Sequence, residues 1–553
     1  MTNDTKVQVI PLGGIGEIGK NMFAVECRGD IIVVDAGLKF PEDEMLGIDY
    51  VIPNISYLIE NRKKIRGIVL THGHEDHIGA IPYILQEIDT PIYGTRLTLG
   101  ILRGKLDEHR LTAKTHEVKA GELVSLGRNF KVRFIHMNHS IPDGVALAIE
   151  TPIGVLLHSG DFKFDQTPVD GKVADYHTLA EYGKKGVLAL FADSTNAHRP
   201  GYTPSERVVG RTLDEIFNRT RDRIIMATFA SNIHRIQQAF DTAVKYGRKV
   251  AVIGRSMINN VRISTELGYL QYPEGAYIEP EEVSRLPAHK VLILSTGSQG
   301  EPLSGLTRMA KQSHNCVNIV PGDTVILSST PVPGNEKLVN RVIDGLARAG
   351  AHVISQESAQ VHVSGHASQE ELKLLINLVR PKYVVPFHGE YRHISAFANL
   401  AEEVGVPRDN VFTLQNGDIL EFDADGARIA GKAPAGVVLV DGLGIGDVGN
   451  VVLRDRQQLS LDGVLVVVVT IDKETRTIKA GPDIITRGFV YVRESENLIA
   501  EAEEQVKASL QTCLRGEITE WSMLKSAAKE VLGSFLYERT KRRPMILPII
   551  MEV

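Results

Sequence analysis

Cysteine is scarce in this chain, and its few cysteines lie far apart. The 553 residues contain only Cys27, Cys316 and Cys513. An odd, widely spaced set argues against a disulfide framework or a cysteine-based zinc finger and is typical of a reducing cytoplasm. We therefore expect a cytoplasmic location, and metal ligands that are histidines and carboxylates.

Long apolar runs and a leader-type N-terminus are also lacking. No apolar run approaches the roughly 18 residues of a membrane span. The longest one, residues 464–470, has the length of a strand. The first residues, MTNDTKVQVIPL, do not show the charged-then-apolar order of a signal peptide. The sequence thus predicts no membrane partner.

Aromatic residues and positive charge are limited as well. Aromatics make up 6% of the chain, with a single Trp, and the formal net charge is −6. Scarce aromatics favour backbone contacts over base stacking in any nucleic-acid complex. Residues 207–360 nevertheless hold more basic than acidic side chains. A phosphate-rich ligand and an ordinary solvated surface explain that excess about equally well.

The pattern of elements changes along the chain and indicates several domains. Up to residue 206, short strands separated by turns predict stacked sheets with helices outside. Over residues 207–360, strands and helices alternate as in a doubly wound α/β domain. A glycine-rich stretch at 426–450 predicts a linker without regular structure. Beyond it, a hairpin, two helices and a final strand predict a small α+β domain over 451–553.

A glycine motif near the N-terminus matches the dinucleotide fingerprint G-x-G-x-x-G, at Gly14, Gly16 and Gly19. That fingerprint requires a helix directly after the glycines, whose N-terminus holds the pyrophosphate. Residues 21–26 have the pattern of a strand instead. We therefore interpret the motif as a turn between strands whose backbone can line a site.

The segment THGHEDH, residues 71–77, concentrates metal-ligand side chains. His72 and His74 alternate on an extended segment and should point the same way, while Asp76 and His77 should open a helix. Such a set suits borderline ions such as zinc or manganese. Glu75 should point away. Three further ligand-type residues follow short apolar strands: His139, Asp161 and His388.

These motifs resemble the metallo-β-lactamase superfamily. The ligand order of THGHEDH, the later His139, SGDFKFD and FHGE is similar throughout, and Asp35 in VVDAG stands where that superfamily has a supporting aspartate. Asp161 and His388 are separated by far more than one strand–helix step, and residues 207–360 fill the gap. An inserted domain of this kind resembles the β-CASP nucleases.

The resemblance narrows to the bacterial ribonuclease J family from about residue 7 to the C-terminus, through motifs such as PLGGIGEIGKNM, FASNIHR and VHVSGHAS. It implies an α/β fold, a metallo-β-lactamase αββα sandwich. Residues 1–206 and 361–425 would form this core, and the β-CASP α/β domain at 207–360 would be inserted in it. The linker at 426–450 and the C-terminal α+β domain at 451–553 would follow.

The resemblance also implies a site with two divalent ions, zinc being expected and manganese or magnesium being alternatives. The seven implied ligands are His72, His74, His139, Asp76, His77, His388 and a bridging Asp161. The implied catalytic residues are Asp161, His366 and Asp193. His366 would protonate or stabilise the leaving 3′ oxygen, and Asp193 would orient His366 or a metal ligand. The implied RNA- and phosphate-binding residues are Ser231, Asn232, Ile233, His362, Val363, Ser364, Gly365 and His366.

The implied activity is 5′-to-3′ exonuclease action on 5′-monophosphorylated single-stranded RNA together with endonuclease cutting, in rRNA maturation and mRNA decay. The implied partners are further copies of the chain, as a dimer or tetramer through the C-terminal domain, a paralogous subunit and other RNA-decay proteins. Two other functions stay open at this point: a small-molecule metallohydrolase of the same fold, and a weakly active scaffold subunit.

A structural calcium ion is a further hypothesis. Asp49 in LGIDY, the Gly47 carbonyl and Asp441 in VDGLGIGD belong to stretches that are strongly patterned for segments outside a core. Oxygen ligands of this type suit calcium. Ordinary turn carboxylates explain the same residues.

Overall fold

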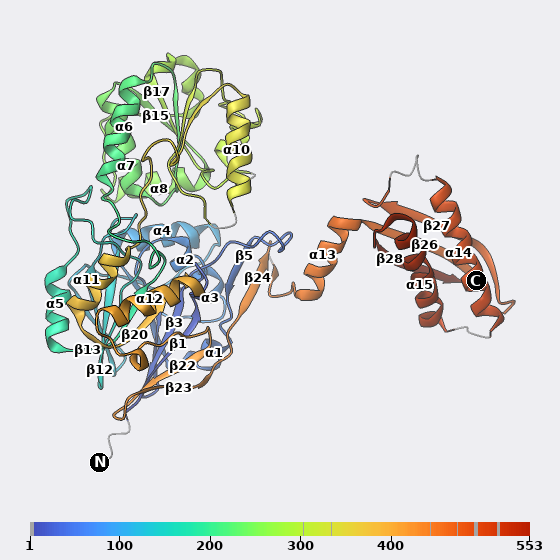
Figure 1. Cartoon of the computed structure of the whole chain (residues 1–553), viewed down its shortest axis with the longest axis horizontal. Coiled ribbons are helices and arrows are strands. Elements are labelled where there is room, and N and C mark those ends of the chain that lie inside the picture. The colour runs from blue at the N-terminus through green and yellow to red at the C-terminus, as the bar shows by residue number, and fades with distance from the viewer. Residues whose placement is uncertain are drawn as a thin grey trace. The chain divides into compact units, whose positions relative to one another are not determined.

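The computed structural model describes residues 5–301, 303–332, 335–442, 444–472, 474–490, 496–516 and 520–553 (Figure 1). It divides into two compact units. The first consists of residues up to 40 together with 50–438, and the second of residues 41–49 and 439–553. No helix in these described ranges has the length and apolar character of a membrane span.

Two β-sheets form the centre of the first unit. One sheet has, in spatial order, β23 (Ala427–Lys432), β22 (Asp418–Phe422), β1 (Val7–Gly13), β3 (Met22–Cys27), β4 (Asp30–Val34), β6 (Ile65–Val69), β7 (Ile92–Gly94) and β8 (Thr115–Glu117). The other has β20 (Pro381–Phe387), β13 (Val187–Asp193), β12 (Gly154–His158), β11 (Val145–Thr151), β10 (Phe130–His136) and β9 (Leu123–Leu126). Three short strands complete the first unit: β2 (Ile15–Gly16), β5 (Tyr50–Pro53) and β21 (Gly389–Glu390). A further strand, β24 (Val437–Asp441), begins at the end of the first unit and continues into the second.

The two sheets pack against each other through apolar side chains that alternate along their strands. Phe23 of β3 illustrates the contact, because its ring centroid lies 6.1 Å from that of Phe191 on β13 and 5.4 Å from that of Phe387 on β20. Burial of this apolar surface is the main force that holds such layers together.

Helices cover the outer faces of both sheets. The helices α5 (Tyr176–Lys185), α11 (Gln369–Val379) and α12 (Tyr391–Glu403) bury apolar side chains against the outer face of the second sheet. The helix α4 (Arg96–Glu108) contacts β7 and β8 of the first sheet. The remaining helices of this part are α1 (Ser56–Glu60), α2 (Glu75–Ile78) and α3 (Ile81–Ile84). The predicted αββα sandwich is confirmed.

A doubly wound domain is inserted between two neighbouring strands of the second sheet. β13 and β20 pair in parallel, with Asp193 opposite Phe387. The inserted parallel sheet has the order β16 (Tyr277–Ile278), β15 (Lys249–Ile253), β17 (Val291–Ser295), β14 (Ile224–Ala227), β18 (Thr324–Leu327), β19 (His352–Ile354). Its helices are α6 (Arg207–Arg219), α7 (Ile233–Lys245), α8 (Arg255–Glu266), α9 (Gly305–Ala310) and α10 (Glu336–Arg348), and they flank the sheet on both sides (Figure 1).

The second unit is an α+β domain, as predicted. Its sheet has the order β27 (Thr477–Arg487), β26 (Val464–Asp472), β28 (Met545–Glu552). The apolar run of β26 alternates, and Leu465, Val467 and Val469 are buried in one core with α14 (Glu496–Arg515) and α15 (Trp521–Thr540). Its other elements are β25 (Gly444–Ile445) and α13 (Asn450–Asp462), a helix that the sequence did not predict.

One local expectation was wrong. Residues 426–450, predicted as an irregular linker, contain β23, β24 and β25. β23 forms although most of its side chains are exposed, because pairing with β22 satisfies its backbone groups. Asp76 and His77 lie in the first turn of a helix, as predicted, but that helix, α2, is short and is followed by a second short helix, α3. The predicted strand after the glycines is confirmed as β3.

The Phe23 contact gives a stability prediction. Phe23→Ala should lower the free energy of unfolding of the first unit by about 3–5 kcal/mol, because it leaves a cavity between the sheets. Urea unfolding followed by circular dichroism measures this change. Phe40, whose side chain is 64% exposed, supplies the control. Equal effects of Phe40→Ala and Phe23→Ala would contradict the assignment of the core.

Candidate metal centre

Strand ends bring the predicted ligands together. β12, β13 and β20 run parallel to one another, so their carboxyl ends lie at the same edge of the sheet. Asp161 follows β12, Asp193 ends β13, and His388 follows β20. The β13–β20 register explains why residues on either side of the inserted domain meet.

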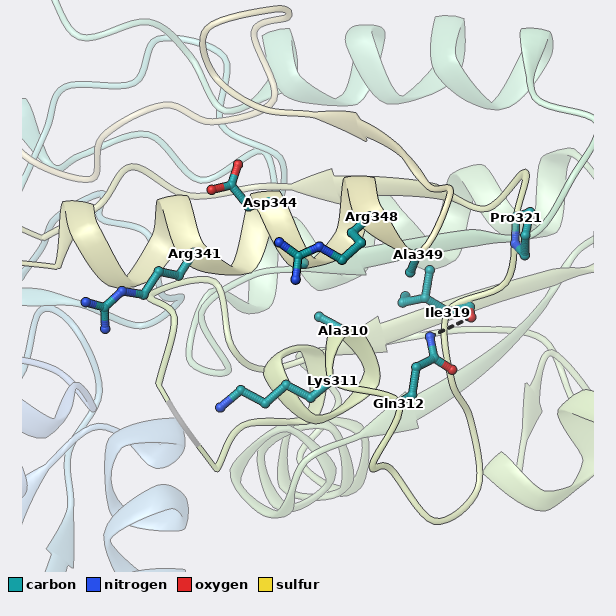
Figure 2. A pocket seen from close by; sticks show the side chains of 10 residues that line it. Ala310, Lys311, Gln312, Ile319, Pro321, Arg341, Asp344, Arg348 and Ala349 are labelled. Atoms are coloured by element: carbon teal, nitrogen blue, oxygen red, sulfur yellow. Dashed lines mark hydrogen bonds between the residues drawn. The ribbon is translucent and has the colours of Figure 1, made fainter. Parts of the chain in front are cut away.

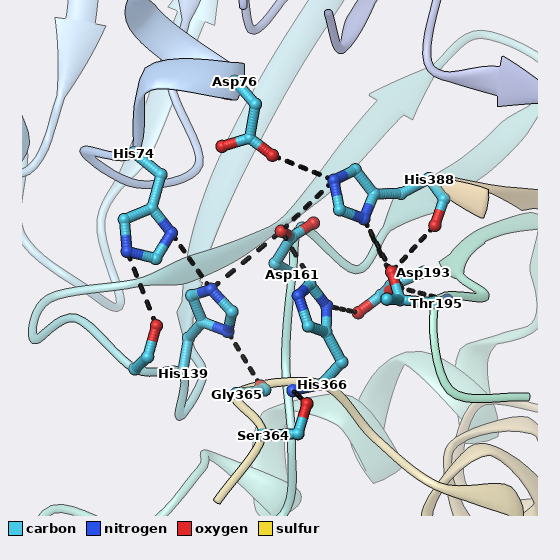
Figure 3. A network of polar contacts seen from close by, with 12 residues as sticks. His74, Asp76, His139, Asp161, Asp193, Thr195, Ser364, Gly365, His366 and His388 are labelled. Atoms are coloured by element: carbon cyan, nitrogen blue, oxygen red, sulfur yellow. Dashed lines mark hydrogen bonds and ion pairs between the residues drawn. The ribbon is translucent and has the colours of Figure 1, made fainter. Parts of the chain in front are cut away.

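Three histidines form the first group, which we call the histidine cluster: His72, His74 and His139. The Nδ1 atom of His74 lies 3.0 Å from Nε2 of His72. The same atom lies 3.1 Å from Nε2 of His139 (Figure 3). Burial lowers the pKa of His72 and His139 well below the usual value and that of His74 to about 4. Neutral imidazoles, the form that binds metals, are therefore favoured.

Two carboxylates and two histidines form the second group, the mixed cluster: Asp76, His77, Asp161 and His388. Nε2 of His77 lies 3.2 Å from Oδ2 of Asp161, and Nε2 of His388 lies 3.0 Å from Oδ2 of Asp76. Burial on its own raises the pKa of Asp161, but His388 and His77 lower the pKa by a larger amount. The net pKa lies below its usual value, so the carboxyl is ionised. The cluster thus offers two anionic and two imidazole donors.

Asp161 lies between the two clusters. Its Oδ2 atom is 4.0 Å from Nε2 of both His72 and His139, besides its contact with the mixed cluster. Its Oδ1 atom is buried and has no hydrogen-bond partner among the described residues. A buried carboxylate oxygen without a partner costs free energy unless a ligand satisfies it. The nitrogen and oxygen donors and this unsatisfied atom together fit divalent metal ions.

Neighbouring residues fix the orientation of the ligands. Asp35 adopts a positive φ of 57° and accepts hydrogen bonds from the Thr71 N–H at 2.8 Å and from His77 Nδ1 at 2.7 Å. His139 Nδ1 donates to the Gly365 carbonyl at 2.8 Å. The hydrogen bonds at Nδ1 of His77 and His139 leave the Nε2 atom of each ring directed at its cluster. Hydrogen bonds of this kind commonly orient metal-binding histidines. Glu75 points away, as expected, and pairs with Lys105 at 2.6 Å.

Sequence reasoning missed Thr195. Its hydroxyl lies 2.7 Å from His388 Nδ1 and donates to Asp193 Oδ1 at 2.7 Å. The hydroxyl therefore links a predicted ligand to a predicted catalytic residue. The signal in the sequence was weak: Thr195 comes two positions after Asp193, and only the pairing of β13 with β20 places it beside His388.

Asn21 and Gly37 were missed for a similar reason. The Asn21 amide nitrogen lies 3.1 Å from His77 Nε2 and donates to the Asp76 carbonyl at 3.1 Å. A Cβ added to Gly37 would lie 1.6 Å from the same carbonyl oxygen, so no side chain fits there. The turn between β1 and β3 and the end of β4 thus hold α2, which carries two predicted ligands.

The loop of residues 362–366 lies next to the clusters. His366 Nδ1 donates to Asp193 Oδ2 at 2.7 Å. Burial lowers the pKa of His366, but Asp193 and Asp161 raise it more, so it lies above its usual value. The Ser364 hydroxyl oxygen accepts from the His366 N–H at 3.1 Å and from the Asn196 amide at 2.9 Å. The loop is therefore held from both sides.

Arg235 connects the two segments that we predicted to bind RNA. The Asn232 side chain caps α7 by accepting from the Arg235 N–H at 3.0 Å. The Arg235 guanidinium is fully buried, pairs with Glu206, and donates to the Val361 carbonyl at 3.1 Å, while His362 Nδ1 is 3.4 Å away. Residues 231–233 and 362–366 thus meet through one buried cation that sequence reasoning missed.

Protein contacts account for the residues of the hypothetical calcium site. The Asp441 carboxylate is ion-paired to Arg456, and the same guanidinium donates to the Leu46 carbonyl at 2.9 Å. Asp49 accepts from the Gly442 N–H at 2.8 Å. A Cβ on Gly47 would lie 2.7 Å from an Arg456 nitrogen, so the guanidinium fills the place expected for a cation. These contacts do not support a calcium ion there.

The sandwich, the inserted domain and the clusters define the chain as a metallo-β-lactamase-fold hydrolase of the β-CASP type. Family models agree: the metallo-β-lactamase superfamily matches residues 15–227, and the Zn-dependent metallo-hydrolase RNA specificity domain matches residues 352–414. The β-CASP domain of ribonuclease J matches residues 221–346 and the ribonuclease J C-terminal domain residues 451–553. The chain belongs to the ribonuclease J family and is a metal-dependent ribonuclease.

Curated relatives match over essentially their full length. Ribonuclease J2 of Bacillus subtilis (strain 168) is 49% identical over 100% of this chain and 99% of its own. Ribonuclease J 1 of Streptococcus pyogenes serotype M3 is 47% identical over 99% and 98% of the two chains. A solved structure of a protein of unknown function from Enterococcus faecalis V583 covers 75% of this chain and 99% of its own, with a TM-score of 0.54 and 16% identity, and supports the fold alone.

The contact between Thr195 and His388 yields a testable prediction about metal affinity. Thr195→Val should weaken divalent-metal binding by about 10–100-fold, because His388 loses the partner that orients its ring. Isothermal titration of the metal-stripped protein with zinc measures the change. Thr195→Ser keeps the hydroxyl and should bind zinc as the wild type does. If both variants kept wild-type affinity, Thr195 would have no orienting role.

Proposed function

We propose that the chain hydrolyses phosphodiester bonds of single-stranded RNA, both from a 5′-monophosphorylated end in the 5′-to-3′ direction and at internal positions. One observation carries this proposal: the loop of residues 362–366, which resembles the family's RNA-gripping segment, is bonded through Gly365 to His139 of the histidine cluster. A phosphate held by that loop would lie beside the predicted metal ligands.

We assign the seven ligands to two divalent ions. His72, His74 and His139 would hold one, Asp76, His77 and His388 the other, and Asp161 would contact both. Zinc is the expected ion, and manganese and magnesium are the alternatives. When bound, such a pair lowers the pKa of a coordinated water and stabilises the charge that develops on the phosphoryl oxygens.

The protein's own groups would then handle the leaving oxygen. His366 uses Nδ1 for Asp193, which leaves Nε2 as the atom that carries a proton to the leaving 3′ oxygen. A general acid of this type contributes about 10²–10⁴-fold in rate. Asp193 acts as a positioning residue, since it fixes the orientation of His366 and also contacts Thr195.

Recognition of the 5′ end would use the two segments that Arg235 connects. Ser364 accepts two hydrogen bonds, and its own hydroxyl hydrogen stays available for a phosphate oxygen. Backbone N–H groups in a tight turn form a concavity suited to anions. A 5′-monophosphate anchored there would place the first phosphodiester near the clusters, which accounts for exonuclease direction.

The alternative functions have less support. All seven ligand positions carry ligand-type side chains, which argues against a scaffold subunit that has lost activity. The ribonuclease J family models and the inserted domain argue against a small-molecule hydrolase. In the cell we propose roles in rRNA maturation and mRNA decay, alongside a paralogous subunit and other RNA-decay proteins. A cytoplasmic location agrees with three cysteines that are all free.

We also propose that copies of the chain associate through the C-terminal domain as a dimer or tetramer. On the face of its sheet opposite α14 and α15, Ile485 is 53% exposed and Leu547 and Ile549 are each 46% exposed. Replacing Leu547 and Ile549 together by Arg should lower the molar mass measured by light scattering to that of the monomer. Leu461→Arg, on the exposed side of α13, is the control. A monomeric wild type would contradict the proposal.

His366 offers the most direct test of the chemistry. His366→Ala should lower kcat on 5′-monophosphorylated single-stranded RNA by about 10²–10⁴-fold, because the leaving oxygen loses its proton donor. The bound metal content should stay unchanged. Release of mononucleotides and of internal fragments measures both activities, and His289→Ala, an exposed histidine of the inserted domain, is the control. Full activity of the His366→Ala variant, or loss of metal from that variant, would contradict the assignment of His366 as the proton donor.

A further inference from the structure

A groove between α9 and α10 of the inserted domain gathers three cations. Lys311 comes from the end of α9, and Arg341 and Arg348 come from one face of α10 (Figure 2). The groove has a volume of about 710 Å³. Pockets of about 300–1,000 Å³ accommodate small ligands, so this space suffices for a nucleotide unit.

These three cations are not neutralised by the protein. All three side chains are exposed, and within the described part of the chain none forms an ion pair or a side-chain hydrogen bond. Asp344 is the one acidic residue in the lining, so the groove keeps a net positive charge. By contrast, Arg223 in the same domain pairs with Asp323 at 2.6 Å. Unpaired cations around a concave surface are the electrostatic signature of a phosphate ligand.

The groove is separate from the candidate metal centre. Ile319 and Pro321, which line it, precede β18, whereas Ser328, which follows β18, bonds to Arg235 beside residues 361–362. At roughly 3.3 Å per strand residue, the two ends of the four-residue strand β18 lie about 10 Å apart. A ligand in the groove would therefore bind near the N-terminal end of β18, whereas the catalytic loops lie near its C-terminal end.

Local structural roles explain only part of this arrangement. Arg348 lies in the last turn of α10, where a cation stabilises the helix dipole. Lys311 caps the C-terminal end of α9 and gains the same stabilisation there. Arg341 lies two turns before the end of α10 and gains none from it. Between the two arginines, Gly345 lines the groove and lies beside Ala310. The concave surface and the cluster of positive charge are thus found at the same place.

We propose that this groove binds the sugar-phosphate backbone of single-stranded RNA at a distance from the nucleotide being cleaved. Lys311, Arg341 and Arg348 each contact a phosphate, and the groove holds a downstream part of a long substrate. The proposal rests on the RNA substrate of the proposed function. It explains why the inserted domain has an excess of basic side chains although the whole chain is acidic.

The test is direct binding of fluorescently labelled single-stranded RNA in EDTA, which prevents cleavage. The probes are about 4 and about 16 nucleotides long, the limits of single-strand site sizes. The variant combines Lys311→Gln, Arg341→Gln and Arg348→Gln. Its affinity for the long RNA should fall at least tenfold, and the slope of log affinity against log salt should flatten by about 2, for three lost phosphate contacts. Its affinity for the short RNA should equal that of the wild type.

A matched variant separates this site from general charge. Arg219→Gln, Arg285→Gln and Lys290→Gln remove three other exposed cations of the inserted domain, which have no ion pair with any described residue. This variant should bind both RNAs as the wild type does. Thermal unfolding of the two variants should match each other, since every replaced side chain is exposed and each set includes one arginine from the last turn of a helix.

Other outcomes would overturn the proposal. Equal weakening in both variants would mean that net charge matters and the groove does not. Tripolyphosphate that stabilises the wild type but not the groove variant against heat, with unchanged affinity for long RNA, would identify a small polyphosphate as the ligand instead. A wild type that binds neither RNA would contradict the proposed function itself, which is a different result from selective loss of the long RNA.

Discussion

The parallel pairing of β13 with β20 is the constraint on which the site depends. The two strands are neighbours in one sheet although the entire inserted domain separates them in sequence. Their pairing sets Asp193 and Thr195 beside His388, and it anchors the inserted domain at both of its ends. The backbone hydrogen bonds of a buried parallel pair hold this register, because a shift would expose apolar side chains of both strands.

A network of buried charged side chains connects the sandwich to the inserted domain. Arg235 on α7 pairs with Glu206 and bonds to Ser328 and Val361, so strands of the inserted sheet and the loop of residues 362–366 share one cation. The Glu206 N–H in turn donates to Asp165, which follows β12 on the sandwich. Breaking one member of such a network leaves an uncompensated buried charge, which costs several kcal/mol. The orientation of the loop beside the metal ligands is therefore set by the junction of the two domains.

Much of the architecture was predictable from sequence, because the signals were local. Short strands separated by turns indicated the stacked sheets, and the alternation after residue 207 indicated the inserted domain. The proposed ligand set followed from the family resemblance of the motifs. The supporting groups did not, since Thr195, Asn21 and Arg235 act through contacts between segments distant in sequence. The strand β23 was missed because its side chains are exposed and carry no apolar pattern. Arg456 removed the need for the calcium ion that the carboxylates alone suggested.

The account's central claim is that seven side chains hold two divalent ions with Asp161 shared between them. The most direct measurement is the metal content of the folded full-length chain after zinc loading and dialysis, by inductively coupled plasma mass spectrometry. The account predicts two zinc ions per wild-type chain and one per chain in both His74→Ala and His388→Ala. A folded wild type that retains no ion or one ion, or variants that retain two, would contradict it.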